Sequence, residues 1–122
     1  MELSEIRNLL EGYSEKINGF RDSLDLDRLE EEIALLENDM AQPEFWNDQA
    51  AAQKVIDESN ALKAKYDNYQ AMNTMLEEAQ TMLEMLQEEA DEDMQVELEE
   101  MTTALGQKIE SYELEIMLNQ PY

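Results

Sequence analysis

Carboxylates are the one kind of reactive side chain that this sequence carries in large numbers. Of its 122 residues, 31 are Asp or Glu, and there is neither a histidine nor a cysteine. Catalytic triads, Cys/His pairs and helical Glu-x-x-His metal sites each need a residue type that is missing. An active site built from carboxylates alone would also need a concave apolar pocket. The sequence therefore predicts no enzyme activity and no catalytic, cofactor-binding or metal-binding residues.

The densest acidic run is EEADED, residues 88–93. It lacks the alternating ligands, central glycine and terminal glutamate of an EF-hand calcium loop. The surrounding residues 66–107 contain 12 acidic residues and no Lys or Arg. A solvated helix end is the simpler interpretation of such a run, and contact with a basic partner is the alternative. The candidate partner-contact residues are Glu88, Glu89, Asp91 and Glu92.

Charge and hydropathy limit the possible partners and location. Eight basic residues leave a formal charge of −23, and binding to phosphate backbones or anionic membrane surfaces depends on Lys and Arg. No apolar stretch approaches the ~20 residues of a membrane span. The start, MELSEIRNLL, lacks the basic region and apolar run of a signal peptide. We expect a cytoplasmic protein with no direct nucleic acid binding and no membrane attachment.

Apolar residues recur at three- and four-residue spacing along most of the chain, which is the period of an α-helix. Asp25, Asn47 and Asp93 are expected to cap the later helices. We expect an all-α fold, an elongated helical bundle with a long antiparallel helix hairpin and two shorter N-terminal helices, forming a single domain over residues 1–122. The expected helices cover residues of about 4–20, 25–41, 47–91 and 93–119.

Methionine occurs nine times. Flexible methionine side chains are typical of adaptable binding grooves. Core filling and lightly exposed helix surface explain them more simply, and we adopt that interpretation. The two groups at helical spacing are Met72, Met75, Met82 and Met85, and Met94 with Met101.

The stretch QPEFWND, residues 42–48, has the composition of a turn between helices. Pro43 should end the second helix, because proline has no backbone N–H to donate. Phe45 and Trp46 are expected to fold back as a buried apolar plug over the junction. Asn47 is expected to cap the long helix that follows. The predicted structural turn residues are Pro43, Phe45, Trp46 and Asn47.

The run LEEEIALLENDMAQPEFWNDQAAAQKV, residues 29–55, resembles the N-terminal domain of bacterial peptide chain release factors of the release factor 2 family, within the class I release factors. Its most specific part is the Pro-x-Phe-Trp-Asn turn, which the family's sister factor for the other stop codon typically lacks. The end, YELEIMLNQPY, residues 112–122, is similar to that family's junction with the next domain. The resemblance runs in order over essentially the whole chain.

The resemblance implies a part in translation termination. At full length, the family recognises UAA and UGA stop codons and triggers peptidyl-tRNA hydrolysis on the ribosome, using Ser-Pro-Phe and Gly-Gly-Gln motifs. Neither motif occurs in this chain, which would then be an N-terminal domain without the factor's remaining domains and without release activity. In the family this domain contacts protein L11 at the large-subunit stalk base, near the GTPase centre, and affects the interplay with the GTPase release factor 3.

A protein of another class fits the same periodicity. It would be a free-standing acidic helical hairpin with a structural or chaperone-like role, which associates through its apolar seams. Gly-Gly-Gln and Ser-Pro-Phe motifs downstream of Tyr122 would support a termination factor, and a stop codon at that point would support the free-standing hairpin.

Overall fold

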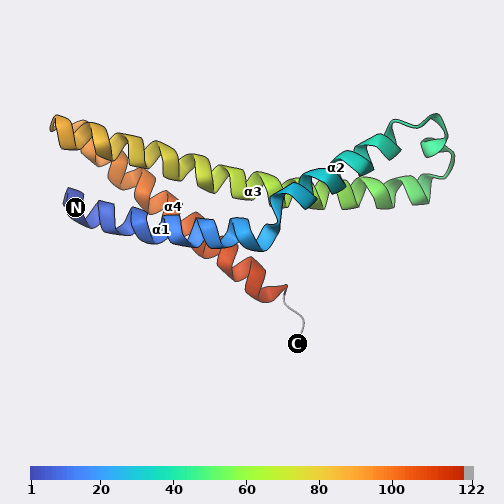
Figure 1. The fold of residues 1–122 in the computed structure, drawn as a ribbon, viewed down its shortest axis with the longest axis horizontal. Helices are drawn as coiled ribbons and strands as arrows, with labels where there is room; N and C mark the ends of the chain where they lie inside the picture. Colours follow the sequence, from blue (N-terminus) through green and yellow to red (C-terminus); the bar gives the residue numbers. More distant parts are fainter. Residues whose placement is uncertain (120–122) are drawn as a thin grey trace. The chain divides into compact units, whose positions relative to one another are not determined.

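The computed structural model describes residues 1–119, and all regular structure within them is helical. The chain beyond Glu88 turns back, so that the last helix runs antiparallel to the end of the 40-residue helix before it (Figure 1). The predicted all-α helical bundle with a long antiparallel hairpin and two shorter N-terminal helices is confirmed. The last three residues of the junction-like segment 112–122 lie outside the described part of the chain. The elements are α1 (Leu3–Leu24), α2 (Leu26–Met40), the 3-10 helix η1 (Pro43–Asn47), α3 (Gln49–Glu88) and α4 (Glu92–Leu118).

The boundary between α1 and α2 lies later than the sequence pattern indicated. α1 continues through Gly19 to Leu24, because one glycine costs a helix only about 1 kcal/mol and the nearby Ile17 is fully buried. The break falls at Asp25, whose φ of 50° lies in the left-handed region that Asp tolerates better than most residues. Asp25 holds the expected N-cap position of α2, yet its side chain caps no N–H among the described residues.

The helices cluster into two compact units. Unit 1 comprises Met1–Gly19 and Ala71–Tyr122, and unit 2 comprises Phe20–Gln70. α1 and α3 therefore each contribute residues to both units. The single domain expected over residues 1–122 stays a prediction.

Unit 1 is a bundle of α1, the C-terminal part of α3 and α4 (Figure 1), and each of these three helices buries an apolar stripe. The three- and four-residue spacing of these residues keeps them on one face of each helix. This face is buried against the other two helices, and the core of unit 1 lies between them. The buried apolar residues are Ile6, Leu10 and Ile17 of α1, Met72, Leu76, Ala79, Leu83 and Leu86 of α3, and Leu98, Leu105, Ile109 and Tyr112 of α4.

Two contacts show how closely α1 and α4 pack in unit 1. A Cβ atom placed on Gly106 would lie 2.5 Å from the hydroxyl oxygen of Tyr13. Glycine at this position therefore lets the tyrosine lie directly against the α4 backbone. Further along, the Lys16 Nζ lies 3.0 Å from the Glu113 Oε1 in an exposed ion pair.

Unit 2 consists mainly of α2, η1 and the N-terminal part of α3. An ion pair joins α2 and α3, with the Lys63 Nζ 2.8 Å from the Glu37 Oε1. Two helices cover each other along one face, so large apolar residues stay in contact with solvent, and Leu35 is 66% exposed. The buried residues of unit 2 are Leu29, Ala52, Ser59 and Tyr69.

Candidate functional site

The four candidate contact residues lie together where α3 is connected to α4. α3 ends at Glu88, and α4 begins at Glu92 after a turn of residues 89–91. The Glu89 N–H donates to the Met85 carbonyl at 3.0 Å, which extends the last turn of α3. The side chains of Glu88, Glu89, Asp91 and Glu92 are all exposed. We call these four residues with Ala90 the acidic turn.

Within the acidic turn, Asp91 has a structural role. Its backbone is extended, with φ −151°, and its Oδ1 accepts the Met94 N–H at 3.0 Å, so Asp91 is the N-cap of α4. The prediction that Asp93 caps this helix is wrong. Asp93 lies in the first turn, where its charge is favourable to the helix dipole. The sequence signal for the true cap was present, since an aspartate followed directly by two acidic residues is typical of a helix start.

In the described part of the chain, the acidic turn has no cationic partner within ion-pair distance. Residues 66–107 contain no Lys or Arg. An open hollow of about 410 Å³ at the turn is lined by Glu88, Glu89, Ala90 and Asp91 together with Met85 and Met94. Unpaired like charges gathered in this way create a negative potential that attracts a cationic surface.

Two further classes of site are absent from the described part of the chain. Over residues 1–119, no three acidic side chains converge in a way that could hold a metal ion. None of the described helices combines the length and hydropathy that a membrane crossing demands.

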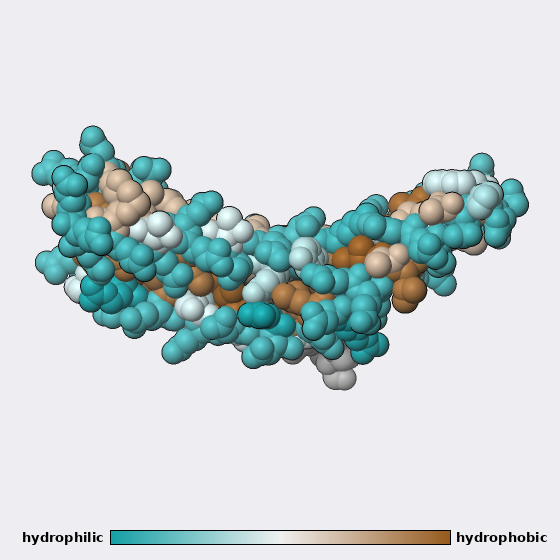
Figure 2. Space-filling model, turned by 45° about the horizontal axis from the view of Figure 1, so that its top comes forward, coloured by the Kyte–Doolittle hydropathy of each residue, from teal (hydrophilic) through white to brown (hydrophobic). Residues whose placement is uncertain are grey.

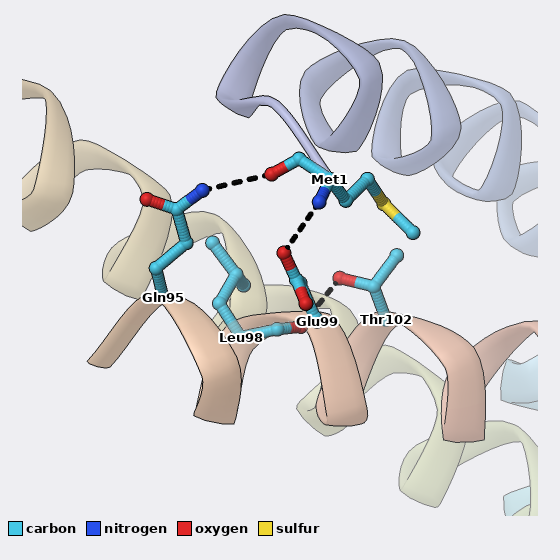
Figure 3. Close-up of polar contacts among 5 residues, drawn as sticks. All are labelled: Met1, Gln95, Leu98, Glu99 and Thr102. Atoms are coloured by element: carbon cyan, nitrogen blue, oxygen red, sulfur yellow. Dashed lines mark hydrogen bonds and ion pairs between the residues drawn. The ribbon is translucent and has the colours of Figure 1, made fainter. Parts of the chain in front are cut away.

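The start of the chain is held against α4 two turns beyond the acidic turn (Figure 3). The Met1 amino nitrogen lies 2.8 Å from the Glu99 Oε1, and the Gln95 Nε2 donates to the Met1 carbonyl at 2.8 Å. The hydrogen bond and charge of Glu99 raise the pKa of the Met1 ammonium above its ordinary value. Beneath them, the buried Thr102 hydroxyl donates to the Leu98 carbonyl at 2.8 Å. Glu99 thus has the cationic partner that the acidic turn lacks.

The second group of predicted site residues forms η1. Pro43 lies at the start of this helix, where its missing N–H is not needed, and the Phe45 N–H donates to the Gln42 carbonyl at 3.1 Å. The rings of Phe45 and Trp46 meet edge to face, with centroids 4.8 Å apart. Trp46 is 60% exposed, so the expected buried plug is wrong. η1 connects the ends of α2 and α3 (Figure 1), and the indole at this position stays in contact with solvent.

The cap of α3 also differs from the prediction. Asn47 is the last residue of η1, and Asp48 accepts the Ala51 N–H through its Oδ1 at 3.2 Å. The Asp48 carbonyl accepts the Ala52 N–H at 2.9 Å. The 3-10 turn includes Asn47, so the cap moves one residue along the chain. The predicted structural turn residues Pro43, Phe45, Trp46 and Asn47 are thus all residues of η1.

A comparison with known families matches most of the chain. The family model described as the PCRF domain matches residues 29–122. This range includes η1, all of α3 and α4, and the acidic turn. The chain belongs to the PCRF domain family.

Curated relatives match the whole chain. Peptide chain release factor 2 of Listeria innocua serovar 6a is 52% identical to it over 122 residues, and that of Exiguobacterium sp. is 48% identical. Peptide chain release factor 2 of Staphylococcus epidermidis is 43% identical over the same length. Each alignment covers 100% of this chain and 33% of the relative, so the chain spans about a third of the length of these relatives. The resemblance to the release factor 2 family is confirmed.

Proposed function

We propose that this chain is the N-terminal docking domain of a cytoplasmic translation termination factor. At full length, such a factor reads UAA and UGA stop codons and triggers peptidyl-tRNA hydrolysis on the ribosome. The observation that carries the proposal is the 43–52% identity, over all 122 residues, to proteins named peptide chain release factor 2. The chain contains neither Gly-Gly-Gln nor Ser-Pro-Phe, so codon reading and hydrolysis are functions of other parts of the factor.

The proposed docking partner is the stalk base of the large ribosomal subunit, including protein L11, beside the GTPase centre. The exposed and unpaired carboxylates of the acidic turn support this partner, because complementary charge speeds the encounter with a basic protein surface. The same position would let the domain affect the interplay with the GTPase release factor 3. Docking through exposed charges should weaken as the salt concentration rises.

Charge reversal at the acidic turn tests the docking surface. Glu88, Glu89 and Glu92 are changed to Lys in a protein of the relatives' full length, and Asp91 is kept because its side chain caps α4. We expect ribosome binding, measured by cosedimentation, to weaken about tenfold or more, the effect of losing 1.4 kcal/mol of binding free energy. The thermal melting curve should change little, because the three side chains are exposed.

A matched control separates the turn from the net charge. Glu11, Glu15 and Asp22 are exposed residues of α1, and their change to Lys alters the net charge by the same amount. This control should bind ribosomes nearly as well as the unchanged protein. Equal weakening in both variants would mean that net charge alone governs binding, and full binding by the turn variant would remove the acidic turn from the interface.

A further inference from the structure

A groove lies on the surface of unit 1 between α3 and α4, next to the acidic turn. It is open to solvent and has a volume of about 580 Å³. Both helices contribute apolar and acidic side chains to it. We call it the methionine groove, and the residues that matter here are Met82, Met85, Glu77 and Glu78 of α3 with Met101 and Glu97 of α4.

Methionines form the apolar part of the groove. Met85 is 50% exposed, and Met82 and Met101 are half-buried. Figure 2 shows moderately hydrophobic residues exposed among hydrophilic ones at the left end of the view. Met72, by contrast, is fully buried, so core filling accounts for that methionine and not for those in the groove. Unbranched thioether side chains adapt their shape to the apolar groups of a partner.

Carboxylates form the rim of the groove. Glu77, Glu78 and Glu97 are exposed, and none of them forms an ion pair with any residue from 1 to 119. Glu77 accepts a hydrogen bond from the Asn73 Nδ2 at 3.2 Å, which leaves its charge unneutralised. An apolar strip bordered by unpaired negative charge is complementary to a helix with an apolar stripe between cationic flanks.

We propose that the methionine groove docks a cationic amphipathic helix of a partner protein. The apolar side chains of that helix lie against Met82, Met85 and Met101, and its Lys and Arg residues pair with the rim carboxylates. A second copy of this chain is a poor occupant, because each copy carries a formal charge of −23 and surfaces of like charge repel. A nucleic acid is a poor occupant for the same reason. The inference concerns residues outside the acidic turn and does not rest on the proposed function.

Methyl NMR can show whether a cationic amphipathic helix binds in the methionine groove, and it does not require a ribosome. The chain, labelled with ¹³C at its nine methionine methyl groups, is titrated with a synthetic Leu/Lys peptide designed as an amphipathic helix. We expect the methyl signals of Met82, Met85 and Met101 to shift. Met117 is the control, because it is 67% exposed and does not line the groove. A peptide of the same composition, with its leucines spread around the helix, should bind at least about tenfold more weakly, since it cannot present an apolar stripe.

Matched variants separate the rim from the overall charge. Glu77→Gln, Glu78→Gln and Glu97→Gln together should weaken peptide binding about tenfold, the effect of 1.4 kcal/mol. Glu11→Gln, Glu15→Gln and Asp22→Asn remove the same number of charges from α1 and should change binding less than about twofold. Equal weakening by the two triple variants would overturn the proposal, because the peptide would then be responding to net charge.

A second pair of variants tests the apolar part of the methionine groove. Met85→Ser should weaken peptide binding about tenfold, whereas Met117→Ser should leave it unchanged. The absence of shifts at the groove methyls, or equal shifts at Met117, would overturn the proposal. Sedimentation of the unbound chain should show a monomer. A dimer that Met85→Ser dissociates would assign the groove to a second copy and overturn the proposal as well.

Discussion

Units 1 and 2 share helix α3 but differ in how well they bury their apolar residues. In unit 1 the side chains of Ile6, Leu98 and Leu105 are 0% exposed. Among the described residues, unit 2 buries three apolar residues, Leu29, Ala52 and Tyr69, against twelve in unit 1, and the hydroxyl of Ser59 is buried there without a hydrogen-bond partner. A third helix makes the difference, because it encloses the apolar faces of the other two. Burial here depends on how many helices pack together, and less on how many apolar residues each one carries.

The turn between α2 and α3 in unit 2 and the turn between α3 and α4 in unit 1 also differ in how well the helices beside them pack. Asp48 and Asp91 cap the helices that follow, with similar geometry. The turn in unit 2 exposes Trp46, since its two helices cannot enclose the ring. The turn in unit 1 closes a three-helix bundle and carries unpaired carboxylates on a well-packed base. Rigid support of that kind suits a surface that must present charges to a partner.

Truncation of buried leucines should give the largest effects. Leu98→Ala in unit 1 should lower the free energy of unfolding by roughly 3–5 kcal/mol, because it leaves a cavity among three helices. Leu29→Ala in unit 2 should cost about 2 kcal/mol, at the low end of the usual range, because a two-helix site can collapse onto the gap. Urea unfolding followed by circular dichroism measures both. If Leu29→Ala lowered the free energy of unfolding as much as Leu98→Ala or more, the two units would not differ in packing as proposed.

Gly106→Ala tests the close approach of α1 to α4 in unit 1. The added methyl group would overlap the Tyr13 hydroxyl, so a loss of about 1–3 kcal/mol of stability is expected from overpacking. Gly12→Ala is the control, since nothing lies within 4 Å of its added Cβ and alanine is the better helix former; it should be neutral or stabilising. Tyr13→Phe should restore part of the loss. A stabilising Gly106→Ala would mean that the Tyr13 side chain moves away from the α4 backbone at little cost.

Trp46→Ala should have a small effect on stability. The indole is 60% exposed, so the loss should be about 1 kcal/mol or less, well below the loss for Leu98→Ala. The chain's single tryptophan also reports its own environment, and its fluorescence should show the emission and acrylamide quenching of a solvent-exposed indole. Blue-shifted emission that acrylamide does not quench would mean that Trp46 is buried, as the sequence suggested, and that unit 2 encloses the indole.

The smallest expected effect is a pH dependence at the edge of unit 1. Glu99 raises the pKa of the Met1 ammonium, so their pair contributes stability below the unfolded-state pKa of about 8. That contribution is lost as the pH rises through the folded-state pKa. Thermal melts of the unchanged protein and of Glu99→Gln should therefore differ at pH 7 and converge at higher pH. A constant difference would contradict the assignment.

Helical periodicity predicted the number and order of the long helices, because the three- and four-residue spacing is repeated many times in each of them. It could not select the capping residue among neighbours such as Asp91 and Asp93, since that choice depends on where the preceding turn ends. It also gave no information on whether a third helix covers a residue, and for this reason it misplaced Trp46. The error at Trp46 concerns tertiary surroundings, whereas the cap of α4 is a local feature of the turn.

The two surfaces of unit 1 differ in how far the sequence could predict them. The acidic turn could be recognised as a group, because its residues are adjacent in the chain. The methionine groove could not, because it forms only when Met101 on α4 lies beside Met82 and Met85 on α3. Which methionines face outward depends on the register between these helices. Sequence spacing within one helix does not determine that register.

A single concentration series tests most directly whether this chain docks without taking part in catalysis. Peptide release from ribosomes that display a UGA codon is measured with a protein of the relatives' full length, with and without residues 1–110. We predict that the deletion raises the concentration needed for half-maximal release and leaves the maximal rate nearly unchanged, as expected when binding alone is lost. Identical curves, or a maximal rate that falls to background, would contradict a docking role.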